Sequence, residues 1–309
     1  METTLSSQEN HRYLREKVGY FFLDHLCLIS AEGSDLFSYL QTQTTNDVNE
    51  LKPGQGQNNA IVDRKARVIS TFSLHRTGEE SAVILVETQQ KENLLNHLNS
   101  FLFREDVTLT SSSHFVLALQ GPKSHEIIKI FTRSNDSIPE KPNDICKFTF
   151  EGLPALAIAK SLTGEEGCVL VFQTESENTI TKKLLELEEQ NLLTHIDHHA
   201  REVFRIEAGI PSYGKDINDK NILPETGLEH SSVSYNKGCY IGQEVIARIK
   251  TYGAPNFALM GLIIEGESLP LLDSEIKLGS KKLGIIKSSI FSYSLQKNVA
   301  LAYIQKDHR

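Results

Sequence analysis

Short strand patterns alternate with single helical patterns along most of this chain, and this alternation limits its possible folds more than any other feature. One unit consists of the apolar stretch 115–119, a turn at Gly121-Pro122, and a segment that places Ile127 and Phe131 on one helical face. Proline is favourable at the first position of a helix, where its missing N–H has no helical partner. Strands interleaved with lone helices predict split βαβ units of an α+β fold.

Hydrophobic periodicity places the other elements. Apolar runs and strict alternation predict strands, whereas apolar residues at helical spacing predict helices. The expected helices cover residues 35–41, 89–103, 178–192 and 199–206, and the expected strands cover residues 20–29, 60–62, 68–74, 83–87 and 169–172, with two more near 148 and 156.

The helical periodicity ends at the turn Gly253-Ala254-Pro255. Beyond it, residues 260–264, 282–287 and 299–304 form strand patterns separated by glycine and proline turns. This segment predicts a small C-terminal β-barrel, and the turn predicts a domain boundary.

The composition excludes several classes of protein. Of 309 residues, 39% are hydrophobic and 23% are charged, as in ordinary globular proteins. The net charge of −8 gives no reason to expect stable nucleic-acid binding. The N-terminal segment carries Glu2, Glu9 and Glu16 without the apolar stretch of a secretory signal, and no apolar run reaches membrane-spanning length. The 4 cysteines form no Cys-x-x-Cys pair, so we expect a cytoplasmic protein.

One stretch suggests chemistry rather than packing, Lys237-Gly238-Cys239-Tyr240-Ile241-Gly242-Gln243-Glu244. Its glycines allow a tight turn or a close approach to a partner. Residues 243–250 are expected to form a short helix, so that Cys239 lies just before a helix N-terminus and near Lys237. Both influences favour the thiolate. A reactive sulfur is one interpretation, and a small buried cysteine is the other.

This octapeptide, with Arg248 four residues beyond it, resembles the signature of the YgfZ family. These proteins are folate-binding relatives of the glycine-cleavage T-protein, associated with assembly or repair of iron–sulfur enzymes. The resemblance covers most of the chain, because T-protein landmarks follow one another in the expected order. They are Thr44-Thr45-Asn46-Asp47-Val48, Leu119-Gln120-Gly121-Pro122, Leu162-Thr163-Gly164-Glu165-Glu166-Gly167, Arg205-Ile206-Glu207-Ala208-Gly209-Ile210-Pro211, Tyr213-Gly214-Lys215-Asp216 and Pro224-Glu225-Thr226.

The resemblance implies a T-protein-like, three-domain ring around a central opening. The first α+β domain would combine residues 1–50 and 115–195, and the second would combine residues 51–114 and 196–252. Residues 253–309 would form the β-barrel.

The resemblance also implies a tetrahydrofolate-binding accessory protein for assembly or repair of iron–sulfur enzymes. Tetrahydrofolate or a one-carbon derivative would be its cofactor, client enzymes or assembly proteins would be its partners, and we expect a monomer. The implied catalytic residues are Cys239 and Lys237, within a motif completed by Gly238, Tyr240, Gly242, Gln243 and Glu244. The implied folate-binding residues are Glu207, Arg205, Tyr213, Arg64, Lys65, Arg67 and Arg248.

Two of these assignments also have a basis in the residues themselves. Glu207 follows a helical run, and its carboxylate can accept two hydrogen bonds from a planar N–C–N edge such as that of a pterin. The alternative is a surface ion pair with a nearby arginine. The basic turn Arg64, Lys65 and Arg67 suits the glutamate tail of a folate, although a solvated hairpin tip explains it as well.

A cluster of histidines, His195, His198 and His199, raises the possibility of a metal site, since histidine is the commonest transition-metal ligand. The only carboxylate near the three in sequence is Asp197. We interpret the cluster as a polar connection between elements and expect no metal.

The chain departs from aminomethyltransferases of the glycine cleavage system at one position. Those enzymes carry a carboxylate after the hairpin, in a Gly-Gly-Ile-x-Asp-Asp-like run, where it orients or deprotonates the reacting amine. This chain has Ser70 and Thr71 there, and a hydroxyl cannot act as a base near neutral pH. We therefore expect no classical aminomethyl transfer, and any activity would be folate-dependent one-carbon or thiol chemistry. A true aminomethyltransferase and a non-catalytic scaffold are the alternatives.

Overall fold

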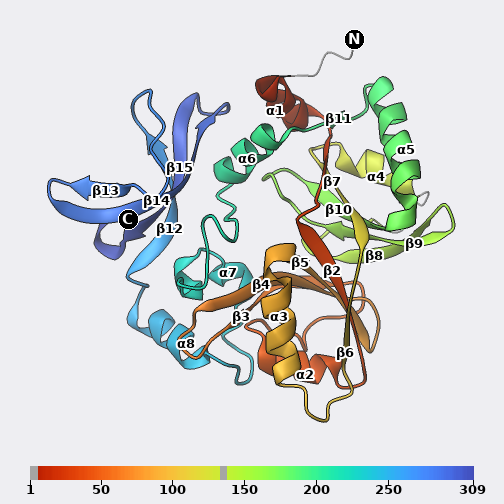
Figure 1. The fold of residues 1–309 in the computed structure, drawn as a ribbon, viewed down its shortest axis with the longest axis horizontal. Helices are drawn as coiled ribbons and strands as arrows, with labels where there is room; N and C mark the ends of the chain where they lie inside the picture. The colour runs from red at the N-terminus through yellow and green to blue at the C-terminus, as the bar shows by residue number, and fades with distance from the viewer. Residues whose placement is uncertain (1–5, 133–137) are drawn as a thin grey trace. The chain divides into compact units, whose positions relative to one another are not determined.

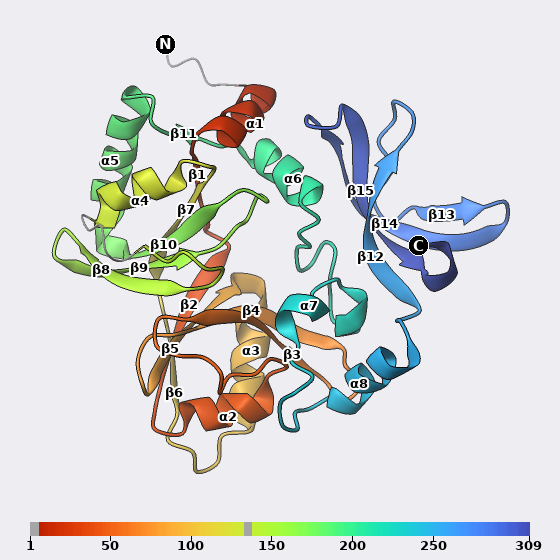
Figure 2. The same cartoon turned by 180° about the vertical axis from the view of Figure 1, so that it is seen from behind.

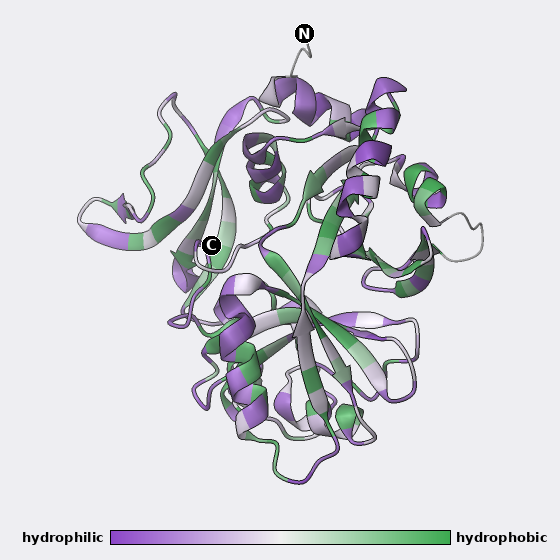
Figure 3. Cartoon of the chain, turned by 45° about the vertical axis from the view of Figure 1, so that its right-hand side comes forward, coloured by the Kyte–Doolittle hydropathy of each residue, from purple (hydrophilic) through white to green (hydrophobic). Residues whose placement is uncertain are grey.

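Three β-sheets and their flanking helices make up the part of the chain that the computed structural model describes, residues 6–132 and 138–309 (Figures 1 and 2). Residues 1–5, part of the segment predicted not to be a signal peptide, lie outside the described residues. In the described ranges, no helix is both long and apolar enough to cross a membrane. Figure 3 shows hydrophobic colour along the strands and mixed colour on the helices, as expected for sheets that carry the core.

The chain forms two compact units, each built from separate segments. Unit 1 comprises Met1–Phe37, Glu50–Asn58 and Phe72–Arg201, and unit 2 comprises Ser38–Asn49, Asn59–Thr71 and Glu202–Arg309. The division into three domains implied by the resemblance stays a prediction.

Unit 1 contains a six-stranded sheet around a central apolar strand. The strands run in the order β11 (Thr194–His195), β1 (Gly19–Phe22), β7 (His114–Gln120), β10 (Gly167–Gln173), β9 (Leu153–Ala159) and β8 (Ile145–Phe150). Helix α5 (Glu177–Glu189) places Ile180, Leu184 and Leu187 at helical spacing in the core of this sheet. Each fully buried side chain of this size contributes about 1.5–3 kcal/mol. Unit 1 also contains the helices α1 (Ser7–Glu16), α4 (Ser124–Thr132) and η1 (Thr174–Ser176).

A second sheet contains the predicted hairpin at one edge. Its strand order is β3 (Gly56–Val62), β4 (Val68–Arg76), β5 (Ser81–Glu87), β2 (Leu26–Glu32) and β6 (Thr108–Ser112). The boundary between the two units falls within β3 and β4. The helices that follow β2 and β5 in the chain are α2 (Leu36–Gln43) and α3 (Thr88–Ser100).

The third sheet lies in unit 2 and is antiparallel. It has the order β12 (Phe257–Ile264), β15 (Lys297–Gln305), β14 (Lys281–Ser292) and β13 (Glu275–Leu278). Helix α6 (His198–Glu207) packs Val203 and Ile206 against Ile290, Val299 and Leu301 of this sheet. Closure of the sheet into a barrel is not confirmed and stays a prediction. The remaining elements are η2 (Leu223–Glu225), α7 (Glu229–Ser232), α8 (Gln243–Tyr252) and η3 (Lys306–His308).

The apolar run 20–29, predicted as one strand, is two strands in two different sheets. β1 pairs with β7, whereas β2 pairs with β5 and β6. The break is a turn at Asp24 and His25, closed by a 2.9 Å hydrogen bond from the Leu26 amide to the Leu23 carbonyl. Two polar residues inside an apolar run therefore mark a turn here. The predicted α+β class is confirmed by the three sheets and the helices between their strands.

Candidate functional site

The turn Thr44-Thr45-Asn46-Asp47 is fixed on several sides within unit 2. The Thr45 amide donates to the Ala60 carbonyl at 3.0 Å, and the Asn46 amide donates to Asn59 Oδ1 at 3.2 Å. Asn46 Nδ2 donates to the Ser231 carbonyl at 3.2 Å. Strand β3 and helix α7 therefore hold this landmark in one conformation.

Lys237, the first residue of the octapeptide, is held against the same turn. Its Nζ donates to the carbonyl oxygens of Thr44 and Asn46 at 2.7 Å each, and it lies 5.3 Å from the centroid of the Tyr240 ring. The residue is only 7% exposed. Burial lowers the pKa of Lys237 to about 8, against the opposing charge of Asp47. The ammonium group thus fixes the turn, and its catalytic role beside Cys239 stays a prediction.

The two glycines of the octapeptide differ in what the fold requires of them. Gly242 has φ +84° and is the N-cap residue of α8. A Cβ there would lie 2.5 Å from the Asp63 carbonyl oxygen and 2.7 Å from Val62 Cγ2. In contrast, apart from Gly238 and its two chain neighbours, no described residue has an atom within 4 Å of a Cβ built on Gly238. Gly242 is therefore required for the hairpin and the helix to approach each other, whereas Gly238 borders open space.

The exposed Cys239 precedes helix α8 as predicted, at three residues before its N-cap. The helix buries Ile246 in the cluster that also contains Val62. Glu244 and Arg248 lie one turn apart on its exposed side, and Gln243 is its first residue. The position and exposure of the thiol are thus consistent with reactivity, which stays a prediction.

The basic hairpin tip is a rigid turn that displays its cations. Asp63 Oδ1 accepts hydrogen bonds from the amides of Lys65 at 2.7 Å and Arg67 at 2.9 Å. Ala66 has φ 62° and is buried, while Arg64, Lys65 and Arg67 are exposed. The three cations are accessible to a ligand, and their role in binding stays a prediction.

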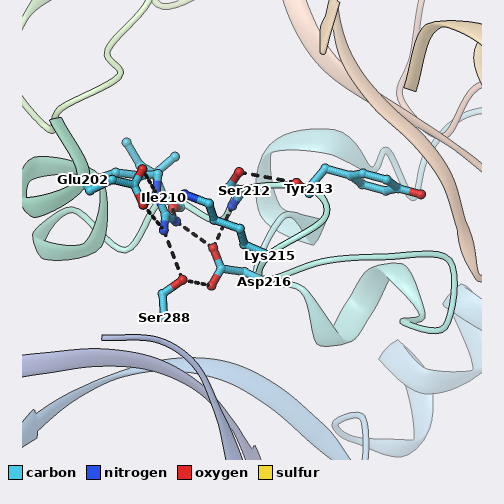
Figure 4. A network of polar contacts seen from close by, with 8 residues as sticks. Glu202, Ile210, Ser212, Tyr213, Lys215, Asp216 and Ser288 are labelled. Carbon is cyan, nitrogen blue, oxygen red and sulfur yellow. Dashed lines mark hydrogen bonds and ion pairs between the residues drawn. The ribbon is translucent and has the colours of Figure 1, made fainter. Parts of the chain in front are cut away.

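Arg205 is at the centre of a polar network around the end of α6. Figure 4 shows its partners Glu202, Ile210, Asp216 and Ser288. Its guanidinium donates to Asp216 Oδ2 at 2.6 Å, to Glu202 Oε1 at 3.0 Å, to the Ile210 carbonyl at 2.7 Å and to Ser288 Oγ at 3.1 Å. Burial alone raises the pKa of Glu202, but the hydrogen bond and charge of Arg205 outweigh it and lower this pKa to about 2. The guanidinium predicted to bind folate is therefore engaged in fixing the loop 208–216.

Glu207, the last residue of α6, presents its carboxylate to the turn after β14. Its Oε1 accepts from Ser292 Oγ at 2.6 Å and from the Ser294 amide at 3.2 Å, and its Oε2 accepts from Ser294 Oγ at 3.0 Å. Donors of Ser292 and Ser294 thus bind both oxygens of this carboxylate. The contact of Glu207 with folate stays a prediction.

Tyr213 lies on the loop fixed by Arg205. Its backbone forms a bridge with Ile217, and its side chain packs against the hydrophobic cluster that contains Tyr240. Figure 4 shows the ring pointing away from Asp216 and Ser288. The network therefore fixes the backbone of Tyr213, while its ring packs against the hydrophobic cluster.

Several buried polar atoms of unit 2 have no partner in the described residues, and one of them belongs to Asn59, which the sequence did not single out. Asn59 Nδ2, Ser70 Oγ and the Tyr240 hydroxyl have no hydrogen-bond partner among the described residues, although Asn59 and Ser70 are fully buried. Burial, with the charge of Glu229, raises the pKa of Tyr240 to about 12. A buried polar atom without a partner is costly, so a ligand or water is expected to complete it. The signal for Asn59 was its place inside an apolar strand.

The histidine cluster connects two elements of the structure. His195 ends β11 and packs edge-on against Tyr20 at 5.3 Å, and burial lowers its pKa. His198 and His199 begin α6. In the parts of the chain that are described, no group of three His, Cys, Asp or Glu side chains gathers where it could hold a metal ion.

Comparison with known proteins places the chain in a family. The model of the GCVT N-terminal domain matches residues 2–237. An aminomethyltransferase of Bacillus cytotoxicus is 28% identical over 307 residues, which cover 97% of this chain and 82% of the relative. An aminomethyltransferase of Halalkalibacterium halodurans is 28% identical over 312 residues, covering 98% and 83%.

A solved structure has the same fold. Glycine cleavage system aminomethyltransferase T from Bartonella henselae superposes with a TM-score of 0.84 at 19% identity, and the match covers 97% of this chain and 82% of that chain. The predicted T-protein-like fold is thus confirmed.

The predicted membership of the YgfZ family is wrong, and so is the predicted role in iron–sulfur enzyme assembly or repair. Relatives that match 97% of the chain are named aminomethyltransferase, and the matching family model is that of the GCVT domain. The error has a definite origin. The landmarks from Thr44 to Thr226 belong to the T-protein in general, so the YgfZ assignment depended on the octapeptide, and the family match ends at its first residue, Lys237. The chain belongs to the GCVT N-terminal domain family.

Proposed function

We propose that this protein binds tetrahydrofolate and acts as an aminomethyltransferase. The observation that carries the proposal is the match to proteins named aminomethyltransferase over 97% of the chain. Proteins of this family use tetrahydrofolate as substrate or cofactor. Bound tetrahydrofolate supplies the nitrogen atoms that accept the one-carbon group.

Polar groups of unit 2 support the binding of such a ligand. Glu207 ends α6, and Ser292 and Ser294 hold its carboxylate by hydrogen bonds. Asn59, Ser70 and Tyr240 supply buried polar atoms that have no partner among the described residues. Ligand sites of this kind combine apolar walls with a few polar groups that fix orientation. We assign the pterin contact to Glu207, with Tyr213 as a second contact.

The exposed cations of unit 2 fit the other end of a folate. Arg64, Lys65 and Arg67 surround the rigid hairpin tip, and Arg248 is exposed on α8. A glutamate tail carries carboxylates, which guanidinium and ammonium groups bind through charge-assisted hydrogen bonds. We assign these cations to the tail.

Lys237 and Cys239 are the proposed catalytic residues. Burial lowers the pKa of Lys237 to about 8, towards the range that general acid–base catalysis uses. Lys237 also holds the turn Thr44 to Asn46, so its position is fixed before any ligand binds. Cys239 offers an exposed thiol two residues away.

A second candidate function is folate binding without transfer. The observation that favours it is Ser70, whose buried hydroxyl stands with Thr71 where the resemblance places the carboxylate of an active transferase. Loss of a general base costs about 10²–10⁴-fold in rate. Under this alternative the site holds folate, and the transfer step is absent.

One assay separates the two candidates. Purified protein is mixed with an aminomethylated lipoyl carrier protein, with and without tetrahydrofolate, and ammonia release is measured. The transferase predicts ammonia release that requires tetrahydrofolate and is lost in Glu207→Ala. Tetrahydrofolate binding without ammonia release supports the second candidate instead. In that case Ser70→Asp, which restores a carboxylate, is the variant that should gain activity.

A further inference from the structure

Strand β14 presents a polar face to helix α6 at regular spacing. Ser288, Ile290 and Ser292 alternate along the strand and are 5%, 7% and 0% exposed, so all three point to the buried side. Ile290 packs in one cluster with Val203 and Ile206 of α6. The apolar residue thus lies between two serines, and each serine meets a charged group at the end of α6.

Ser288 completes the buried ion pair at one end of this face. Its Oγ donates to Asp216 Oδ1 at 2.5 Å and accepts from Arg205 Nη2 at 3.1 Å. Asp216 in turn accepts from the Ser212 amide at 2.9 Å. A register shift in the pairing of β14 with β15 falls just before Ser288, and such irregularities commonly re-aim a side chain.

Ser292 holds the carboxylate at the other end. Its Oγ donates to Glu207 Oε1 at 2.6 Å and accepts from the Leu295 amide at 2.9 Å, which closes the turn after β14. Ser294 in this turn adds its amide and its hydroxyl to the same carboxylate. The strand and the turn after it therefore orient Glu207 through hydrogen-bond donors.

These contacts are not needed to attach the helix to the sheet. Val203, Ile206, Ile290, Val299 and Leu301 already form an apolar contact there. The serines instead orient charged side chains, because each hydroxyl binds a charged group that lies next to the loop carrying Tyr213. Charged side chains held by several hydrogen bonds lose the freedom to adopt other rotamers before a ligand arrives, which lowers the entropic cost of binding.

We propose that Ser288 and Ser292 of β14 are positioning residues of the folate site, which set the loop 208–216 and the Glu207 carboxylate for ligand binding. The C-terminal sheet is then part of the binding machinery. This inference rests on the proposed binding of folate by Glu207.

The chain offers a matched control on the same strand. Ser289 lies on the opposite face of β14, and its hydroxyl donates to the Pro270 carbonyl at 2.9 Å, away from α6. The experiment measures tetrahydrofolate binding by calorimetry and the thermal midpoint for wild type and for the Ser→Ala variants at positions 288, 289 and 292. Ser288→Thr and Ser292→Thr, which restore the hydroxyl, are measured beside them.

Hydrogen bonds to charged groups are among the stronger ones in proteins, so the loss of one should weaken tetrahydrofolate binding about tenfold. We expect this loss in Ser288→Ala and Ser292→Ala, recovery in the threonine variants, and wild-type affinity in Ser289→Ala. Wild-type affinity in both alanine variants would overturn the inference and leave the proposed function intact. The inference would also be overturned if affinity and thermal midpoint fell together in the alanine variants and threonine did not restore the affinity, since that result indicates a structural role. A wild-type protein that does not bind tetrahydrofolate would overturn the proposed function, and this inference with it.

Discussion

Substitution of Gly242 by alanine should destabilise unit 2 strongly, whereas the same substitution at Gly238 should not. Gly242 has φ +84°, and its added methyl group would meet the Asp63 carbonyl oxygen at 2.5 Å and Val62 Cγ2 at 2.7 Å. A Cβ in the left-handed region costs about 1–2 kcal/mol. The steric overlap adds about 1–3 kcal/mol, because the backbone carbonyl cannot rotate away as a side chain would.

The expected loss in free energy of unfolding is therefore about 2–5 kcal/mol for Gly242→Ala. Gly238→Ala should change it by less than about 0.5 kcal/mol, the range for exposed positions without special features. Urea unfolding followed by tyrosine fluorescence suits this chain, which has 9 tyrosines and no tryptophan. Equal midpoints for the two variants would refute the reasoning that Gly242 alone is required by the contact between hairpin and helix.

Three further predictions concern charged groups. Lys237→Met should loosen the turn at Asn46, measured as faster amide exchange there, and unchanged exchange would contradict the proposed anchor. The wild type should gain stability between pH 8 and 10.5, because the pKa of Lys237 is lowered from 10.5 to about 8 and the folded protein binds fewer protons there than the unfolded chain. Lys237→Met should lack this gain. Glu202, with its pKa lowered from 4.5 to about 2, stabilises the fold above pH 4.5, and this contribution is lost as pH falls towards 2, so Glu202→Gln should flatten the acid limb of a stability profile. Combined removal of the charges of Arg64 and Lys65 should erase a preference for polyglutamylated folate at low salt, and an unchanged preference at both high and low ionic strength would exclude the tail contact.

The local elements were largely predictable, and the exceptions have local causes. Hydrophobic periodicity located α3, α5 and β10 because each buries a regular apolar face. β6 escaped prediction, since Thr108–Ser112 is mostly exposed and lacks apolar alternation, and it forms only by pairing with β2. α1 had a readable signal that was not used, the capping box of Ser6 and Glu9.

The candidate site was less predictable, because its contacts join distant residues. Lys237 binds the carbonyl of Thr44 across 193 positions, and no local pattern indicates that its ammonium group will bind backbone oxygens. Similarly, Arg205 pairs with Asp216 and Ser288, and no local pattern indicates that Ser288 comes from the C-terminal sheet. The residue types indicated which chemistry each side chain can perform, whereas its hydrogen-bond partners could be identified only from the folded structure.

Titration of the protein with tetrahydrofolate tests the central claim, that unit 2 binds reduced folate through Glu207. Calorimetry is carried out on the wild type, on Glu207→Ala and on Ser289→Ala as a control on the far face of β14. The account predicts saturable binding to the wild type and the control, and strongly weakened binding to Glu207→Ala. Absence of binding to the wild type at millimolar ligand, or equal binding to all three proteins, would contradict it.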